Sequence, residues 1–425
     1  DNLLKIVSLD EETLNKLLNC PIREKNLPWI EEQLDAMCKA YNAIEGAKNN
    51  DESNLRDLEA LRQRREFYER VTKLLIDRMV DELGRRFSNL HNSSTSSEQV
   101  MNILNNLLVF SPLILFCKIM SPESYEKLLE LWNANSQAIH KTIWDKEFAK
   151  LDKNEIMELK ANHAILMEKG TEQLLKQWKH FKTTRKTTTD EPIYGDILVS
   201  VLEMLESLQK QCIYYQNFID LYFHISSTQN FTEAIKAKYS PEYNHSLLAS
   251  IHCIESDREA AVKKMDIVSK AFQSVVTSIS VKISDILKEE NSVAPALMLY
   301  LEQKIKELES TNQDYLSSAY NRLLAQINQS WSEFLEESLV QMERSFHGAS
   351  LSDALTVINN TAVYMKNIQD LFEYIQSQMK IENTNTFDTV SIVETGCTTL
   401  TLRVSKILDR KNDGGSIISG IQGNN

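Results

Sequence analysis

The chain has 425 residues, of which 42% are hydrophobic, 25% charged and 8% aromatic, and this apolar content excludes a disordered protein. It contains 10 glycines and 7 prolines, too few for the phosphate loops of parallel α/β enzymes or the frequent turns of β-sandwiches. A net charge of −13 argues against a duplex nucleic-acid binder. The six cysteines are scattered, which indicates reduced thiols in the cytosol. The sequence starts without Met inside a helical pattern, and we expect a piece of a longer protein.

Two helical segments are predicted in the first quarter of the chain. Apolar residues recur every three or four positions through 52–90, and arginines and acids share the opposite, solvated face. A run without charges follows at 103–117 and contains Pro112. Its continuous apolar part is too short to cross a membrane, which indicates a buried helix. Because the residue before a proline avoids the α-helical conformation, we predict a kink at Pro112, with a bend or break at Ser111.

A third helical pattern, at about 152–182, ends in a basic segment. The segment has no acid between Lys176 and Thr189, and it includes Trp178 and Phe181. Such a segment can bind an anionic membrane or an acidic partner, whereas the same lysines can also lie along a solvated helix end. The candidate contact residues for an anionic surface or a partner are Lys176, Lys179, Lys182, Arg185 and Lys186.

The most regular pattern lies at 247–286, where apolar residues follow alternating steps of three and four, as in a heptad repeat. A helical pattern at 198–222 precedes it, and another at 301–342 follows after a short connection, so the two long helices should run antiparallel. The 247–286 seam packs either against 301–342 of the same chain or against a second copy in a dimer. The expected core residues of the seam are Ile251, Met265, Phe272, Ile279, Leu323, Ile327 and Phe334.

These patterns predict an all-α fold, arranged as an elongated rod of stacked antiparallel helical bundles. The long helices also account for the scarcity of glycine, because they need few turns. We expect N-terminal helical bundles at 1–190, a C-terminal bundle with long antiparallel helices at 191–380, and a terminal helix with a flexible tail at 381–425.

No spacing of reactive residues predicts catalysis, and none of the common phosphate-loop, zinc-protease, hydrolase or calcium-loop motifs is present. The nearest group of metal-ligating types is His245, His252 and Cys253, in which the two histidines are two helical turns apart. That separation is too large for one ion without a third element, so we expect ordinary surface or core roles for them. We therefore predict no catalytic residue, no metal and no cofactor.

The stretch 104–148 resembles a known family. Phe110-Ser-Pro-Leu113 ends one helix, and an acidic helix follows that carries Tyr125, Leu128, Leu129, Leu131 and Trp132. This combination resembles exocyst complex component one, the phosphoinositide-binding, membrane-landmark subunit of the exocyst. The segments 64–87 and 328–344 are similar to neighbouring helices of that family, so the resemblance covers about 55–345.

The resemblance implies a non-enzymatic subunit of the exocyst, of the helical-rod type found in tethering complexes. It would join other exocyst subunits and help hold secretory vesicles at the plasma membrane before fusion. The implied location is the cytoplasm and the plasma membrane at sites of polarised secretion. Rho or Rab family GTPases and anionic plasma-membrane lipid are further implied partners, mainly through regions outside this sequence, and nucleic acid is not one. The alternatives are a GTPase-responsive helical effector and a dimeric membrane-associated helical scaffold outside the exocyst.

Overall fold

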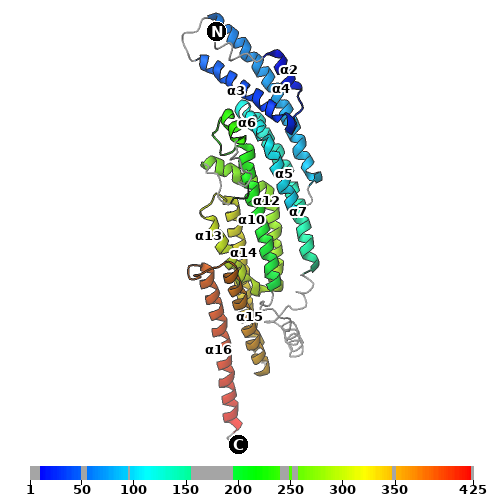
Figure 1. The fold of residues 1–425 in the computed structure, drawn as a ribbon. Helices are drawn as coiled ribbons and strands as arrows, with labels where there is room; N and C mark the ends of the chain where they lie inside the picture. Colours follow the sequence, from blue (N-terminus) through cyan, green and yellow to red (C-terminus); the bar gives the residue numbers. More distant parts are fainter. Residues whose placement is uncertain are drawn as a thin grey trace. The chain divides into compact units, whose positions relative to one another are not determined.

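The computed structural model describes residues 10–48, 55–93, 96–154, 195–239, 248–250, 257–346 and 351–422 (Figure 1). Every regular element in these ranges is a helix, and they contain no strand. The predicted all-α fold is therefore confirmed. The chain divides into two compact units, which are described separately below.

Each compact unit combines segments that are distant in the sequence. Unit 1 comprises 1–145, 210–274 and 312–315, and unit 2 comprises 146–209, 275–311 and 316–425. The boundary falls within four helices, which are α7 (Pro122–Asn154), α10 (Gly195–Phe223), α12 (Arg258–Glu289) and α14 (Asp314–Phe346). The expected domains at 1–190, 191–380 and 381–425 stay a prediction, because compactness alone does not show which segments fold independently.

Unit 1 consists of helices from the first third of the chain together with parts of α10 and α12. Its elements before α10 are α2 (Glu11–Asn19), η1 (Glu24–Asn26), α3 (Leu27–Lys48), α4 (Leu55–Ser93), α5 (Ser97–Leu107), η2 (Leu108–Phe110), α6 (Ser111–Met120) and most of α7 (Pro122–Asn154). The short α11 (Phe231–Lys238) follows α10. Ser96 and Ser121 cap α5 and α7, since each side-chain oxygen accepts a hydrogen bond of 3.3 Å from a backbone N–H three residues later.

An aromatic cluster forms the centre of unit 1. The Trp132 ring lies 5.1 Å from that of Phe87 and 5.3 Å from that of Phe218, measured between centroids. Its indole N–H donates a hydrogen bond of 2.8 Å to the hydroxyl of Tyr215. These rings come from α4, α7 and α10, and all are at most 1% exposed. Buried aromatic rings whose polar groups are hydrogen-bonded stabilise the packing, and here they join three helices.

The helical run through Pro112 is interrupted slightly earlier than predicted. The 3₁₀ segment η2 separates α5 from α6, and Pro112 lies in the first turn of α6. Ser111 itself is α-helical, with φ −51° and ψ −38°, so the expected bend at Ser111 is wrong. The proline needs no helical hydrogen-bond partner at this position, because the first N–H groups of a helix have none.

One helical stretch in the described part of the chain, Ser97–Met120, is long and apolar enough to cross a membrane by length and composition. Its most apolar window is 67% buried inside the structure. The core helix of a soluble protein meets the same criterion, and the buried residues of α6 extend without a gap from Ser111 to Cys117.

Unit 2 is formed around α13 (Ala294–Leu308), whose first eight residues are all buried. Helix α13 contacts α15 (Leu351–Gln378), α16 (Asp388–Gln422) and η4 (Asn291–Val293). Gly396 of α16 lies against Trp331 of α14, and a Cβ at this position would overlap the indole ring. Glycine is thus required here for close helix packing.

The N-terminus of α16 is held by a carboxylate from another helix. Glu302 of α13 accepts hydrogen bonds from the backbone N–H groups of Asp388 at 2.8 Å and of Thr389 at 2.9 Å. A negative charge at a helix N-terminus also interacts favourably with the helix dipole. At the other end, α16 continues to Gln422, where the composition predicted a flexible tail.

Candidate functional site

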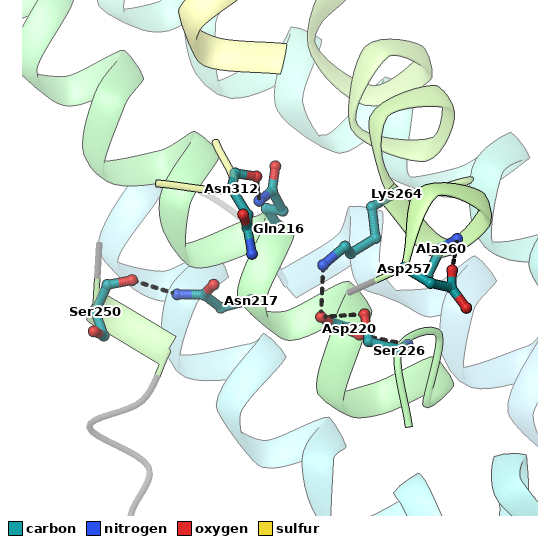
Figure 2. A network of polar contacts seen from close by, with 9 residues as sticks. All are labelled: Gln216, Asn217, Asp220, Ser226, Ser250, Asp257, Ala260, Lys264 and Asn312. Carbon is teal, nitrogen blue, oxygen red and sulfur yellow. Dashed lines mark hydrogen bonds and ion pairs between the residues drawn. The ribbon is translucent and has the colours of Figure 1, made fainter. Parts of the chain in front are cut away.

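The Asp220 network is a set of polar side chains buried in unit 1 at the C-terminal end of α10 (Figure 2). At its centre, Lys264 Nζ of α12 donates a hydrogen bond of 2.8 Å to Asp220 Oδ2, and the two side chains are only 3% and 4% exposed. Asp257 precedes α12 and caps it, because Oδ1 accepts a hydrogen bond of 2.8 Å from the Ala260 N–H. The buried ion pair therefore connects α10 with the first turns of α12.

The Asp220 carboxylate also holds the chain as it leaves α10. Ser226 donates its backbone N–H to Oδ1 and its hydroxyl to Oδ2, both at 2.9 Å. The chain turns at His224, whose φ of 50° lies in the left-handed region that non-glycine residues rarely adopt. Three donors thus satisfy one buried carboxylate, and the hydrogen bonds from Ser226 stabilise this turn.

Two amide side chains of α10 bind loops from other parts of unit 1. Asn217 Nδ2 donates to the carbonyl oxygens of Leu248 at 3.0 Å and Ser250 at 2.7 Å, and Gln216 Nε2 donates to that of Asn312 at 2.7 Å. Loop backbone has carbonyl groups without helical partners, and these amides satisfy three of them. The last two turns of α10 therefore position several segments that are distant in the sequence.

A second buried charge fixes α11 on α3. Glu31 is fully buried, and its carboxylate accepts hydrogen bonds from Lys238 Nζ at 2.6 Å and from the Tyr239 hydroxyl at 2.7 Å. Lys238 also donates to the carbonyl oxygen of Val109 at 2.7 Å. Helix α11 starts with a capping box, in which Asn230 and Glu233 bind each other's backbone N–H groups.

The buried histidines of unit 1 are neutral at physiological pH. Burial lowers the pKa of His140 to about 3, and its ring lies between those of Tyr215 and Phe272, at centroid distances of 5.0 and 4.2 Å. Burial also lowers the pKa of His224 to about 4. His224 Nε2 is 2.6 Å from the Ser111 hydroxyl, which links the turn after α10 to α6. Their packing and low pKa make both histidines poor general bases at neutral pH.

The polar clusters of the described residues have the properties of structural groups. Burial raises the pKa of the Cys38 and Cys117 thiols to about 12, which leaves them protonated and unreactive at neutral pH. No group of three or more His, Cys, Asp or Glu side chains with a metal-binding arrangement occurs among the residues that the structure describes. The arrangement can hold helix ends and loops in place.

The residues predicted for contacts and for the seam have different outcomes. The basic residues Lys176, Lys179, Lys182, Arg185 and Lys186, and Ile251 of the seam, lie outside the described residues. Phe272, Ile279 and Ile327 are fully buried, Leu323 is 1% exposed, and Phe334 is partly buried against Tyr364.

The expectation that Met265 lies in the core is wrong, since its side chain is 38% exposed. The inward position is taken by the preceding residue, Lys264, whose charge meets Asp220. One residue corresponds to a rotation of about 100° around a helix of 3.6 residues per turn, which turns Met265 toward solvent.

The two halves of α12 contact different helices. Within unit 1, Phe272 packs on His140 of α7 and Tyr215 of α10, at ring-centroid distances of 4.2 and 5.5 Å. Within unit 2, Gln326 of α14 donates hydrogen bonds to the Ser280 carbonyl at 3.0 Å and the Ser284 hydroxyl at 2.6 Å. The second half of α12 therefore lies beside α14 of the same chain, as one of the two alternatives predicted. The single long helix expected at 301–342 is wrong, because α13 ends at Leu308 and α14 begins only at Asp314.

Sequence reasoning missed the Asp220 network, because charged side chains on long helices are usually solvated. A usable signal was present in the spacing. Lys264 precedes Val268 and Phe272 by four and eight positions, and therefore shares their buried face. Asp220 is likewise next to Ile219 on a helix rich in apolar residues. Opposite charges on two apolar faces indicate an internal ion pair.

The comparison with protein families concerns the second half of the chain. Residues 222–425 match the family model "Exocyst complex component Sec3, C-terminal". This part of the chain is therefore similar to the C-terminal region of that exocyst subunit family. A comparison with curated proteins found no match.

The family match and the sequence resemblance cover different parts of the chain. The match to the Sec3 family extends from the end of α10 through α16 and includes the segment 328–344. The motifs at 104–148, on which the resemblance mainly depended, lie outside it. The matched region also includes the C-terminal residues 414–425.

Proposed function

We propose that this chain is a non-enzymatic subunit of the exocyst vesicle-tethering complex. Its helical surfaces would join other exocyst subunits and help hold secretory vesicles at the plasma membrane before fusion. The observation that carries the proposal is the match of residues 222–425 to the Sec3 C-terminal family. The independent resemblance of 104–148 to the same exocyst subunit supports it.

The structural chemistry is compatible with such a role. Buried ion pairs and amide-to-carbonyl hydrogen bonds hold the ends of α10, α11 and α12, so the exposed faces of these helices have fixed positions. Fixed surfaces favour binding of partner helices, because less conformational entropy is lost on association. The elongated, stacked arrangement of bundles stays part of the proposal, as does a location in the cytoplasm and at plasma-membrane sites of polarised secretion.

Contacts with anionic lipid are assigned in this proposal to the basic segment at 176–186. Each basic residue near an anionic bilayer contributes about 1 kcal/mol and acts only within about 8 Å at physiological salt. We expect weak, salt-sensitive pelleting with acidic liposomes. Charge reversal of Lys179, Lys182 and Arg185 should abolish it at low salt, and pelleting that survives the reversal would place the lipid contact elsewhere.

The subunit role is tested by affinity capture from cytosol with the chain as bait, followed by mass spectrometry. We expect other exocyst subunits to be enriched over a bait of similar size and charge. Their consistent absence, together with recovery of a GTPase bound only in its GTP form, would favour the alternative of a GTPase-responsive effector. A dimer in light scattering would favour the helical scaffold instead.

A further inference from the structure

A groove of about 900 Å³ in unit 1 is bordered by α4 and by the first turns of α7. The α4 residues that line it recur at helical spacing from Glu69 to Asp77, so one face of that helix forms a wall about two turns long. Residues from Glu123 to Glu130 of α7 line it over a similar length. Ile76, which is 3% exposed, contributes apolar lining. Two helical walls with apolar lining between them can accept a third helix.

The charges along the groove are mainly negative. Its lining contains five acidic residues and two lysines. Glu69 is paired with Arg65 at 2.8 Å, and Glu126 with Lys263 at 2.6 Å. Asp77, Glu123 and Glu130 make no ion pair within the residues that the structure describes. Three carboxylates on the two walls are thus available to a cationic ligand.

A buried hydroxyl in the groove lining provides an independent indication of a ligand. Thr72 is 7% exposed, and its Oγ1 has no hydrogen-bond partner among the described residues. It belongs to the α4 wall, one turn from Ile76. Buried hydroxyl groups are nearly always hydrogen-bonded in folded proteins, because an unpaired one loses its water without compensation. A partner side chain that enters the groove can supply the missing donor.

We propose that this groove binds a basic amphipathic helix of a partner protein. Apolar residues on one face of that helix would contact Ile76 and its neighbours, and flanking lysines or arginines would meet Asp77, Glu123 and Glu130. A second copy of this chain fits less well, since the chain carries a net charge of −13 and would repel itself. The same net charge attracts a basic partner at long range and accelerates association. The inference deepens the proposed function and rests on it, since an assembly subunit needs such partner surfaces.

The test uses the full chain and a fluorescent synthetic peptide with leucines on one helical face and lysines on both flanks. We expect binding by anisotropy that weakens with added salt. A peptide of the same composition with the leucines scrambled should bind several-fold more weakly, because it cannot present an apolar face. Equal binding of both peptides would reduce the groove to a non-specific acidic surface and overturn the proposal.

Two variants locate the binding. Asp77→Lys, Glu123→Lys and Glu130→Lys together should weaken binding at least about tenfold. The matched control reverses three exposed acids of α14 (Glu333→Lys, Glu336→Lys and Glu337→Lys), which changes net charge equally and should retain most binding. Equal losses in both triple variants, or no binding of the peptide by the wild-type chain, would contradict the assignment.

The Thr72→Val variant separates folding from binding. Valine has nearly the same shape, so the melting temperature should stay the same or rise, while peptide binding weakens about two- to tenfold. Unchanged binding would exclude Thr72 as a contact, and with it the groove as the binding site. If the peptide fails to bind while exocyst subunits still co-purify, the groove is wrong and the proposed function stands. If neither occurs, both fail.

Discussion

The buried pair of Asp220 and Lys264 provides the sharpest test of how unit 1 is held together. The Asp220→Asn variant removes the negative charge and leaves the Lys264 ammonium, 3% exposed, without a counter-ion. Breaking a buried pair from one side typically costs about 3–5 kcal/mol of the free energy of unfolding. We expect a loss in this range for Asp220→Asn.

The partner variant should cost less. Lys264→Met keeps a long apolar side chain, and the Asp220 carboxylate still accepts both hydrogen bonds from Ser226. We therefore expect a loss of about 1–3 kcal/mol, corresponding to a buried charge that retains part of its hydrogen bonding. The double variant should lose clearly less than the sum of the single losses, because the second change removes a charge that the first left unpaired.

Urea unfolding measures these differences in the free energy of unfolding. The dependence of that free energy on urea concentration should have the same slope in all variants. The matched control is the surface pair of Asp266 and Lys270 on the same helix, whose side chains are 58% and 54% exposed. Asp266→Asn should cost less than about 0.5 kcal/mol. The argument that this pair organises the end of α10 would be refuted by two results together. Each single variant would lose less than about 1 kcal/mol of the free energy of unfolding, and the double variant would lose the sum of the two.

Four further variants test the packing and the pH dependence of stability. Phe272→Ala should destabilise the chain by about 3–5 kcal/mol in urea unfolding, because it empties a buried aromatic site; an unchanged midpoint would contradict its burial. Gly396→Ala should cost about 1–3 kcal/mol, since the new Cβ meets Trp331, whereas Gly46→Ala, with open space around it, should stabilise by up to about 1 kcal/mol in the same assay. His140 has a pKa of about 3 in the folded chain and 6.5 when unfolded, so the unfolded state binds the proton first as the pH falls. Stability should therefore decrease below pH 6.5 by up to about 1.4 kcal/mol per pH unit, and a His140→Leu variant that kept this dependence would show another origin.

Most of the described helices were predictable from the sequence, because their amphipathic spacing is long and regular. The helix predicted at 152–182 lies mostly outside the described residues, and the pattern at 301–342 is divided between α13 and α14. The pattern at 247–286 correctly predicted burial of Phe272 and Ile279, whereas Met265 was misplaced by one position. That error arose because Lys264 pairs with Asp220, and hydrophobic periodicity assigns charged residues to the solvent. An ion pair across two helices depends on their packing, which local spacing does not contain.

The break near Pro112 shows a similar limit. The sequence indicated an interruption, and proline chemistry placed it at Ser111. In the structure the interruption is the 3₁₀ segment Leu108–Phe110, and Pro112 takes the first turn of the next helix. At this position the proline costs no helical hydrogen bond, because the first N–H groups of a helix have no partner within it. The groove beside α4 and α7 was not predicted, because its lining depends on how two helices pack, which local spacing does not contain.

Cross-linking mass spectrometry on the complex captured from cytosol tests the exocyst assignment most directly. Lysines on the described helices within 222–425, such as Lys270, Lys288 and Lys366, report on the part of the chain that matches the Sec3 family. The account predicts reproducible cross-links from this region to at least one other exocyst subunit. Cross-links confined to the chain itself or to a second copy of it, in a sample where exocyst subunits are present, would contradict the account.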